Sequence, residues 1–241
     1  MAAYYTREFG VKPDKIIILY NDIDVRRFAG LRATTSKWSI RRQLGIAEGE
    51  RLVLFVGRIS LSKGGYNVIP VIADVLLQVP RVKCLMIGSI LLEDFRDKLA
   101  ARGLQDSIVL LGAMPNPEVV KYYLAADVLI VPSESEGFPR RLLEAMVLGV
   151  PFVSFDVGGV RDIVDQRQLD CIVPARNTAL FAQRVVKLLS DEELRQELVQ
   201  VGFEQVQRYS TERVARMFVD RIVGDSEESA VDMSRAEGGC F

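Results

Sequence analysis

Short, nearly continuous apolar runs alternate along this chain with longer stretches in which apolar residues recur every three or four positions. The runs are rich in β-branched residues, which is typical of strands that are buried on both faces of a sheet. We predict strands at Ile16–Tyr20, Leu52–Val56, Val82–Ile87, Ile108–Leu111, Val128–Val131, Phe152–Phe155 and Ile172–Val173.

The longer stretches have the spacing of amphipathic helices. We predict helices after Lys63 and at Glu93–Ala101, Pro117–Ala126, Arg140–Leu148, Leu180–Leu189, Asp191–Arg208 and Thr211–Val223. Alternation of strand and helix predicts an α/β fold with a doubly wound parallel sheet. Ligands of such sheets bind beyond the carboxyl ends of the strands, so we expect the site in the loops after Val56, Ile87, Leu111 and Val131.

The two ends of the chain differ from the middle. Residues 1–14 suggest a linker whose first part is the end of a helix, and residues 15–223 form the predicted α/β domain. Residues 224–241 hold five acidic residues, one basic residue and little apolar content. Because such a segment cannot build a core, we predict a disordered acidic tail there.

Composition excludes several classes of protein. Of 241 residues none is histidine, which excludes a Ser-His-Asp triad and His-ligated zinc or haem sites in this chain. The 31 basic and 32 acidic residues nearly cancel, which argues against a nucleic-acid binder driven by a basic field. No apolar run approaches the ~18 residues of a membrane span, and no secretory signal opens the chain. Three cysteines without such a signal suggest the cytoplasm.

The loop after Val56 has the features of an anion site. Gly57 permits a tight turn, Arg58 and Lys63 lie five positions apart, and Gly64-Gly65 precedes a helix. Two cations beside a helix N-terminus suit a diphosphate. Taken alone, a surface arginine and lysine in a loop are more often ordinary solvated charges.

A second candidate follows the strand that ends at Val131. Glu136 lies in the loop, and Glu144 follows eight positions later, about two turns into a helix that begins near Pro139. A carboxylate accepts hydrogen bonds from a vicinal diol such as a ribose. In isolation, two acidic residues near a helix start are also explained by the helix dipole.

Together these segments resemble the C-terminal domain of family 4 retaining glycosyltransferases. The resemblance extends from Lys12 to Ile222 and rests on VGRISLSKGG, on YYLAADVLIVPSESEGFPRRLLEAM with its Glu-x7-Glu spacing, and on CIVPARNTALFAQRVVKLLSDEELRQEL. It implies the GT-B fold, in which two Rossmann-like domains face each other across a cleft. It also implies that residues 1–14 belong to an interdomain helix and linker.

The resemblance implies a role for each matching residue. Arg58, Lys63 and Glu136 would be catalytic: the two cations would hold the donor diphosphate, and Glu136 would contact hydroxyls of the donor sugar. Glu144 would accept the ribose hydroxyls, and Ala113 and Met114 would lie beside the base. The implied donor-binding set is Gly57, Ala113, Met114, Gly137, Phe138, Pro139, Arg140, Leu143 and Glu144. Asn21-Asp22-Ile23-Asp24 would be a turn near the interdomain linker rather than a metal site.

The implied activity is a retaining hexosyl transfer, without a cofactor or metal, from a UDP-, GDP- or ADP-sugar to a glycan or lipid-linked acceptor. A lipid-linked acceptor would place the cytoplasmic enzyme at the inner face of the membrane. We expect neither a membrane span nor a nucleic-acid partner. The acceptor-binding N-terminal domain is missing from the resemblance, so it would be supplied in cis or in trans. Three alternatives stay open: a non-catalytic nucleotide-sugar-binding module, a subunit of a split transferase, and a sugar-nucleotide epimerase.

Overall fold

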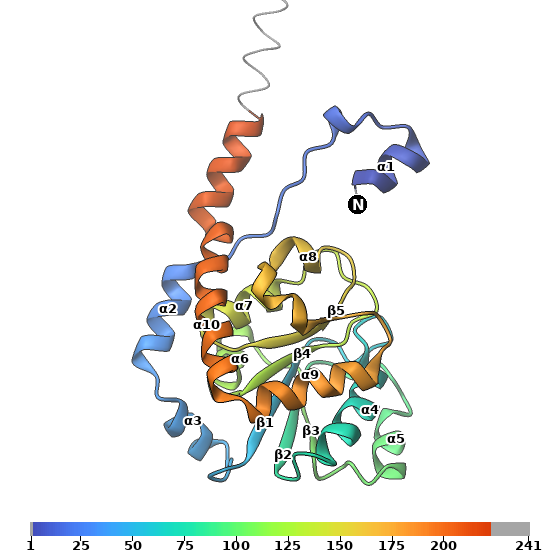
Figure 1. The fold of residues 1–241 in the computed structure, drawn as a ribbon, viewed down its shortest axis with the longest axis vertical. Coiled ribbons are helices and arrows are strands. Elements are labelled where there is room, and N and C mark those ends of the chain that lie inside the picture. Colours follow the sequence, from blue (N-terminus) through green and yellow to red (C-terminus); the bar gives the residue numbers. More distant parts are fainter. Residues whose placement is uncertain (1, 223–241) are drawn as a thin grey trace, which may run out of the picture.

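Six parallel strands form one sheet in the computed structural model, which describes residues 2–222 of the chain (Figure 1). The predicted acidic tail therefore lies outside the described residues. The strand order is β3-β2-β1-β4-β5-β6. The strands are β1 (Arg51–Val56), β2 (Val82–Ile87), β3 (Ile108–Gly112), β4 (Val128–Val131), β5 (Phe152–Phe155) and β6 (Ile172–Val173). The doubly wound α/β fold and these six strands are confirmed.

Helices cover both faces of the sheet because successive side chains of a buried strand point to opposite faces. In β1, Leu52 and Leu54 enter one hydrophobic core, whereas Val53 and Phe55 enter the other. The Leu52 face carries α2 (Val25–Thr34), α3 (Lys37–Gln43), α6 (Asn116–Ala125) and α7 (Arg140–Leu148). The Val53 face carries α4 (Gly65–Leu76), α5 (Phe95–Ala101) and α9 (Thr178–Ser190), and α10 (Glu192–Val206) packs on both α7 and α9.

The remaining elements are short or lie outside these layers. They are α1 (Ala2–Phe9), α8 (Val160–Ile163), the 3-10 turns η1 (Pro13–Lys15), η2 (Gln166–Cys171) and η3 (Gln207–Tyr209), and a last helix over residues 211–222. Within the described range, no helix combines the length and apolar character needed to cross a membrane.

The predicted strand Ile16–Tyr20 is wrong. This segment is extended but belongs to no sheet, and Ile17, Ile18 and Leu19 are 41–43% exposed. Figure 1 shows the segment descending from α1 to the body of the protein. A run of β-branched residues favours extended backbone, but a strand also needs a neighbour to accept its hydrogen bonds.

Helices α2 and α3 were not predicted. Neither carries a long apolar stripe: α2 has no buried residue, and α3 buries only Ile40 and Arg41. Their starts are nevertheless marked by capping side chains, because Asp24 accepts from the Arg27 amide at 2.9 Å and Ser36 from the Ser39 amide at 3.4 Å. Capping residues were therefore the signal that could have located them.

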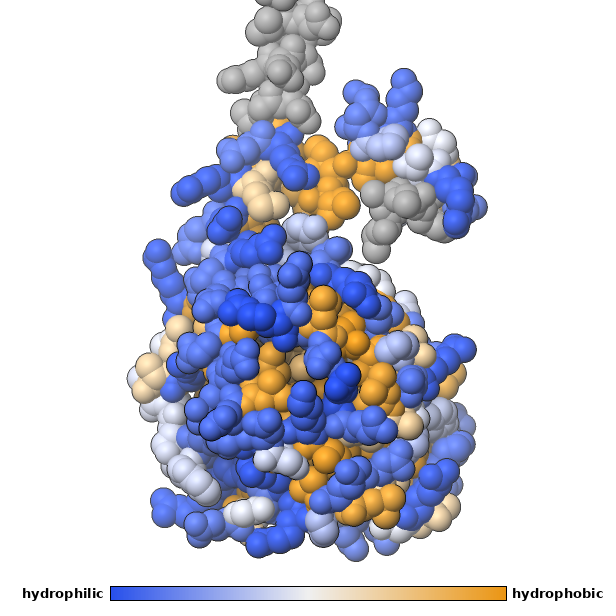
Figure 2. Space-filling model, viewed as in Figure 1, coloured by the Kyte–Doolittle hydropathy of each residue, from blue (hydrophilic) through white to orange (hydrophobic). Residues whose placement is uncertain are grey.

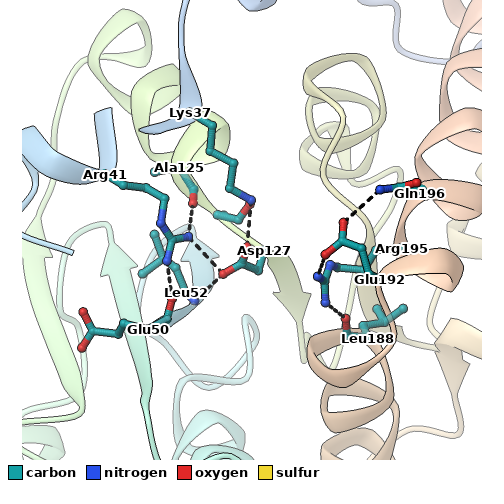
Figure 3. Close-up of polar contacts among 11 residues, drawn as sticks. Lys37, Arg41, Glu50, Leu52, Ala125, Asp127, Leu188, Glu192, Arg195 and Gln196 are labelled. Atoms are coloured by element: carbon teal, nitrogen blue, oxygen red, sulfur yellow. Dashed lines mark hydrogen bonds and ion pairs between the residues drawn. The ribbon is translucent and has the colours of Figure 1, made fainter. Parts of the chain in front are cut away.

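A buried ionic cluster holds α3 to the amino-terminal edge of the sheet (Figure 3). Asp127 accepts hydrogen bonds from Lys37 Nζ at 2.8 Å, Arg41 Nη1 at 3.0 Å and the Leu52 amide at 2.8 Å. Burial by itself would raise the pKa of Asp127, but the cations and the amide outweigh it, so the pKa lies below its ordinary value. Across an open hollow of about 560 Å³, Arg195 pairs with Glu192 on α10.

Candidate functional site

Three loops meet at the carboxyl edge of the sheet, after β1, β4 and β5. The amides of Glu134 and Ser135 both donate to the carbonyl of Ser62, at 3.0 and 3.3 Å. The amide of Gly159 donates to the carbonyl of Gly137 at 3.0 Å. These main-chain bonds join the β4 loop to its neighbours on both sides, so the two predicted candidate segments form one site.

Two glycines make this close loop packing feasible. Gly64 has φ +69°, and a Cβ placed there would lie 1.7 Å from the carbonyl oxygen of Pro132. Gly158 has φ +55°, and its Cβ would lie 1.6 Å from the carbonyl oxygen of Glu136. The sequence indicated close backbone approach at Gly64, and the structure identifies the approaching group as the protein's own β4 loop.

The centre of the site is the carboxylate of Glu136, which lies between two cations. Its Oε2 accepts from Lys63 Nζ at 2.8 Å, and its Oε1 accepts from Arg141 Nη2 at 3.0 Å. The Glu136 side chain is only 6% exposed, against 12% for Arg141 and 20% for Lys63. The structure therefore joins predicted Lys63 and Glu136 directly and adds a cation that sequence reasoning had not assigned to the site.

Arg141 is anchored at both ends of its guanidinium. Nη1 donates to the carbonyl of Val56 at 2.8 Å, while Nη2 holds Glu136. A Cβ on Gly57 would lie 2.9 Å from Nη1, so the glycine leaves room for the guanidinium. The predicted donor-binding residue Arg140 is exposed at the start of α7. Arg58 is likewise exposed, on the β1 loop. The doublet Arg140-Arg141 was the available signal, but it does not reveal which arginine turns inward.

Glu144 lies on α7 and is half-buried. Its Oε2 accepts a hydrogen bond of 3.0 Å from the hydroxyl of Tyr123 on α6. Tyr123 is buried, and burial followed by the nearby Glu144 charge raises the pKa of this phenol well above its ordinary value. The phenol is therefore a neutral donor at physiological pH. The Tyr123–Glu144 hydrogen bond is a second contact in the site that the sequence did not reveal.

The other predicted donor-binding residues differ in exposure. Ala113 and Gly137 are exposed at the loop edge, Met114 and Phe138 pack partly on the core, and Pro139 and Leu143 are buried. Because Leu143 is fully buried, its side chain belongs to the core rather than to an open ligand surface. Pro139 is the N-cap of α7, which has no side-chain cap, so the first turn presents its backbone to the site.

The extended segment that ends at Tyr20 and Asn21 is attached directly beside the site. Asn21 Nδ2 donates to the carbonyl of Phe138 at 3.4 Å, and Tyr20, Phe138 and Tyr209 form an aromatic cluster with ring centroids 5.3–5.8 Å apart. Burial raises the pKa of Tyr209 to about 12. Asp22 accepts from Thr211 Oγ1 at 2.6 Å, and Asp24 caps α2. The Asp22-Ile23-Asp24 turn therefore joins the extended segment, α2 and the last helix.

The arrangement is suited to an anion that carries hydroxyl groups. Three cations, Arg58, Lys63 and Arg141, lie in or beside the loops at one edge, and the carboxylates of Glu136 and Glu144 can accept hydroxyl donors. Over residues 2–222, no group of three or more acidic, cysteine or histidine side chains is placed to hold a metal ion.

Comparison with known proteins agrees with this fold. The family model of glycosyl transferases group 1 matches residues 36–205. An uncharacterised glycosyltransferase of Methanocaldococcus jannaschii is 30% identical over 214 residues, which are 88% of this chain and 55% of that protein. The chain thus spans about half the length of the curated relatives it matches.

Solved structures share the fold. HepE of Anabaena, crystallised in complex with UDP, has a TM-score of 0.81 at 19% identity, covering 92% of this chain and 61% of that one. The C-terminal domain of LpcC from Francisella tularensis has a TM-score of 0.68 at 22% identity, covering 78% of this chain and 99% of that domain. The chain belongs to the glycosyl transferases group 1 and has the Rossmann-like fold of the C-terminal domain of a GT-B glycosyltransferase.

Proposed function

We propose that this chain is the donor-binding half of a family 4, retaining glycosyltransferase that uses a nucleoside-diphosphate sugar. The observation that carries the proposal is the carboxylate of Glu136 held between Lys63 and Arg141, where the β1 and β4 loops meet. Sugars offer hydroxyl donors to a carboxylate, and diphosphates offer oxygens to cations.

The diphosphate lies over the β1 loop in this proposal. Arg58 is exposed there, and Lys63 is the more accessible of the two cations on Glu136. Arg58 is already open to solvent, and Lys63, which rests on Glu136, would turn to the bound anion so that both cations neutralise it. The bound UDP of the structurally similar HepE supports a nucleotide diphosphate as the ligand class. The donor carries uracil, guanine or adenine, and the nucleotide that binds identifies the base.

The sugar and the ribose contact different carboxylates. Glu136 accepts hydroxyls of the donor sugar, and Glu144 accepts the ribose hydroxyls through the oxygen that Tyr123 leaves free. Backbone groups of Gly137 and Phe138, beside the uncapped start of α7, face the sugar and phosphates. The edge loop with Ala113 and Met114 lies beside the base.

Transfer of the hexosyl group breaks the bond between its anomeric carbon and the diphosphate oxygen, and the electron pair leaves with the nucleotide. Arg58 and Lys63 stabilise the negative charge that develops there, so no metal ion is required. The acceptor hydroxyl forms the new bond on the same face, which retains the anomeric configuration, and its proton passes to the departing diphosphate oxygen. The acceptor is a glycan or a lipid-linked glycan, in the latter case at the cytoplasmic face of a membrane.

A second, acceptor-binding domain completes the enzyme, either in the same polypeptide or as a separate subunit. Two features support it: the chain spans about half of its relatives, and apolar side chains are exposed beyond the site. These exposed apolar side chains are Ile17, Ile18 and Leu19 on the extended segment and Phe218, Val219 and Ile222 on the last helix. Figure 2 shows apolar surface where this segment and helix leave the body.

The donor site is tested by thermal unfolding of the chain with UDP, GDP and ADP in turn, with EDTA present. A ligand that binds only the folded state raises the midpoint, by roughly 5–10 °C at a concentration of ~100 times its Kd. We expect one nucleotide to do so. The shift should be lost in Lys63→Ala and in Glu144→Ala, and it should persist in Arg102→Ala, an exposed residue at the C-terminal end of α5.

Absence of a shift with all three nucleotides would contradict the proposal. A shift that needs a divalent cation would contradict its metal-independent part. If the nucleotide binds but no transfer follows when the acceptor domain is supplied, the chain is instead a nucleotide-sugar-binding module. Release of an epimerised sugar nucleotide would indicate an epimerase.

A further inference from the structure

We propose that Arg141 is a positioning residue: it remains on Glu136 so that Lys63 can leave this carboxylate and hold the donor diphosphate. The proposal rests on the function inferred above and assigns a role to a residue outside the predicted diphosphate-binding pair. The side chains concerned are Lys63, Glu136 and Arg141, and Glu136 contacts both cations at the carboxyl edge of the sheet.

Glu136 and the donor diphosphate compete for the ammonium of Lys63. Lys63 is bonded to Glu136 Oε2 at 2.8 Å, yet the proposed function requires its ammonium at the diphosphate. Glu136 is 6% exposed, so water cannot readily replace a departing cation. A buried carboxylate without a counterion is strongly unfavourable. A lone Lys63–Glu136 pair would therefore oppose donor binding.

Arg141 removes this obstacle because it holds the other carboxylate oxygen. Its Nη2 lies 3.0 Å from Oε1, so Glu136 keeps a charged partner when Lys63 moves. The cluster of two cations and one carboxylate carries a net charge of +1, and this surplus charge is available to an anion.

The structure also distinguishes which cation stays. The planar guanidinium of Arg141 is tied to the carbonyl of Val56 at 2.8 Å and fills the space that Gly57 leaves open. Lys63 has a flexible stem, three rotatable donors and the greater exposure. Arg141 is thus the fixed partner of Glu136, and Lys63 is the exchangeable one.

The test measures the affinity of the chain for UDP, GDP, ADP and inorganic pyrophosphate by isothermal titration calorimetry. For the ligands that the unmodified chain binds, Arg141→Met should weaken binding about tenfold or more, as expected for loss of a charge-assisted hydrogen bond. In a Glu136→Gln background, the same Arg141→Met change should have little effect, because no buried carboxylate is left to neutralise.

This double-mutant comparison separates positioning from direct contact. If Arg141 bound the diphosphate itself, its removal would weaken binding equally with and without the Glu136 carboxylate. Arg141→Lys keeps the charge without the fork and should recover part of the affinity. Arg102→Met removes an exposed arginine at the C-terminal end of α5, outside the loops of the site, and should leave binding unchanged. Circular dichroism confirms that each protein is folded before titration.

Two results would overturn the inference. Equal affinity of Arg141→Met and the unmodified chain would show that Lys63 needs no substitute on Glu136. An equal loss in both backgrounds would make Arg141 a direct ligand instead of a positioning residue. If the unmodified chain binds none of the four probes, the proposed function fails and the inference fails with it, which differs from either of the first two results.

Discussion

The hydroxyl of Tyr123 donates a 3.0 Å hydrogen bond to Oε2 of Glu144 across the packed helices α6 and α7. Tyr123 is buried and Glu144 is half-buried, so the bond fixes one carboxylate oxygen and directs the other. The raised pKa of Tyr123 keeps this donor protonated even in mildly alkaline solution. The proposed ribose acceptor is therefore oriented before any ligand arrives.

Tyr123→Phe should weaken binding of the cognate nucleotide about threefold to tenfold, because Glu144 loses the hydrogen bond that orients it. Inorganic pyrophosphate lacks a ribose, so its affinity should not change. Calorimetric titration of both ligands makes the comparison, with Tyr122→Phe on the same helix as the matched control. Equal weakening of both ligands would mean that Glu144 does not act through the ribose.

Glu136→Gln should separate the two halves of the donor. Removal of the carboxylate raises the net charge of the Lys63–Arg141 cluster from +1 to +2, so the nucleoside diphosphate should bind at least as tightly as before. The additional affinity for the sugar-bearing donor should fall about tenfold, because a charged hydroxyl acceptor is lost. Titration of the variant with the nucleotide and with its sugar conjugate tests both expectations. Parallel losses for both ligands would contradict the assignment of Glu136 to the sugar.

Asp127→Asn should lower the free energy of unfolding at pH 7 by about 3 kcal/mol, because it leaves Lys37 and Arg41 without their carboxylate. The folded-state pKa of Asp127 is depressed, so its contribution is complete above the ordinary value of ~3.9 and is lost as the pH falls toward the folded pKa. Urea titrations at pH 7 and pH 3 should show the difference from the unmodified chain narrowing at pH 3. The exposed Asp106→Asn serves as the control, and a difference independent of pH would contradict the ionic explanation.

Gly158→Ala should destabilise the protein by about 2 kcal/mol or more, because the residue has φ +55° and its Cβ would overlap the carbonyl of Glu136. Displacement of that loop should also weaken nucleotide binding. Gly30→Ala in α2 is the matched control: nothing lies within 4 Å of its Cβ, and alanine should stabilise the helix by up to ~1 kcal/mol. Thermal midpoints of the two variants should therefore shift in opposite directions.

The fold could be predicted because its strands are buried on both faces. Continuous apolar runs identified β1 to β6, and three-to-four spacing identified most of the helices that cover them. The predicted strand Ile16–Tyr20 was wrong because its residues favour extended backbone but have no neighbouring strand. Helices α2 and α3 were not predicted because neither carries a long apolar stripe. Each begins at a capping side chain, and the Asp127 cluster also holds α3.

The loops that carry the site followed from strand order, since parallel strands bring their carboxyl ends to one edge. Their residue types placed Lys63 and Glu136 in the site, but the pairing of these two side chains depends on how the β1 and β4 loops pack. Neighbouring arginines on a helix point about 100° apart. Which of Arg140 and Arg141 meets Glu136 is therefore set by the orientation of α7 on the sheet.

The sequence by itself determined the family, the layered α/β architecture and the loops that hold the candidate chemistry, because these depend on local spacing and residue type. Only the tertiary structure decided that Arg141 holds Glu136, that Tyr123 orients Glu144, and that Gly158 faces a carbonyl. Each of those contacts joins residues from different elements, and its geometry depends on packing that no local pattern encodes.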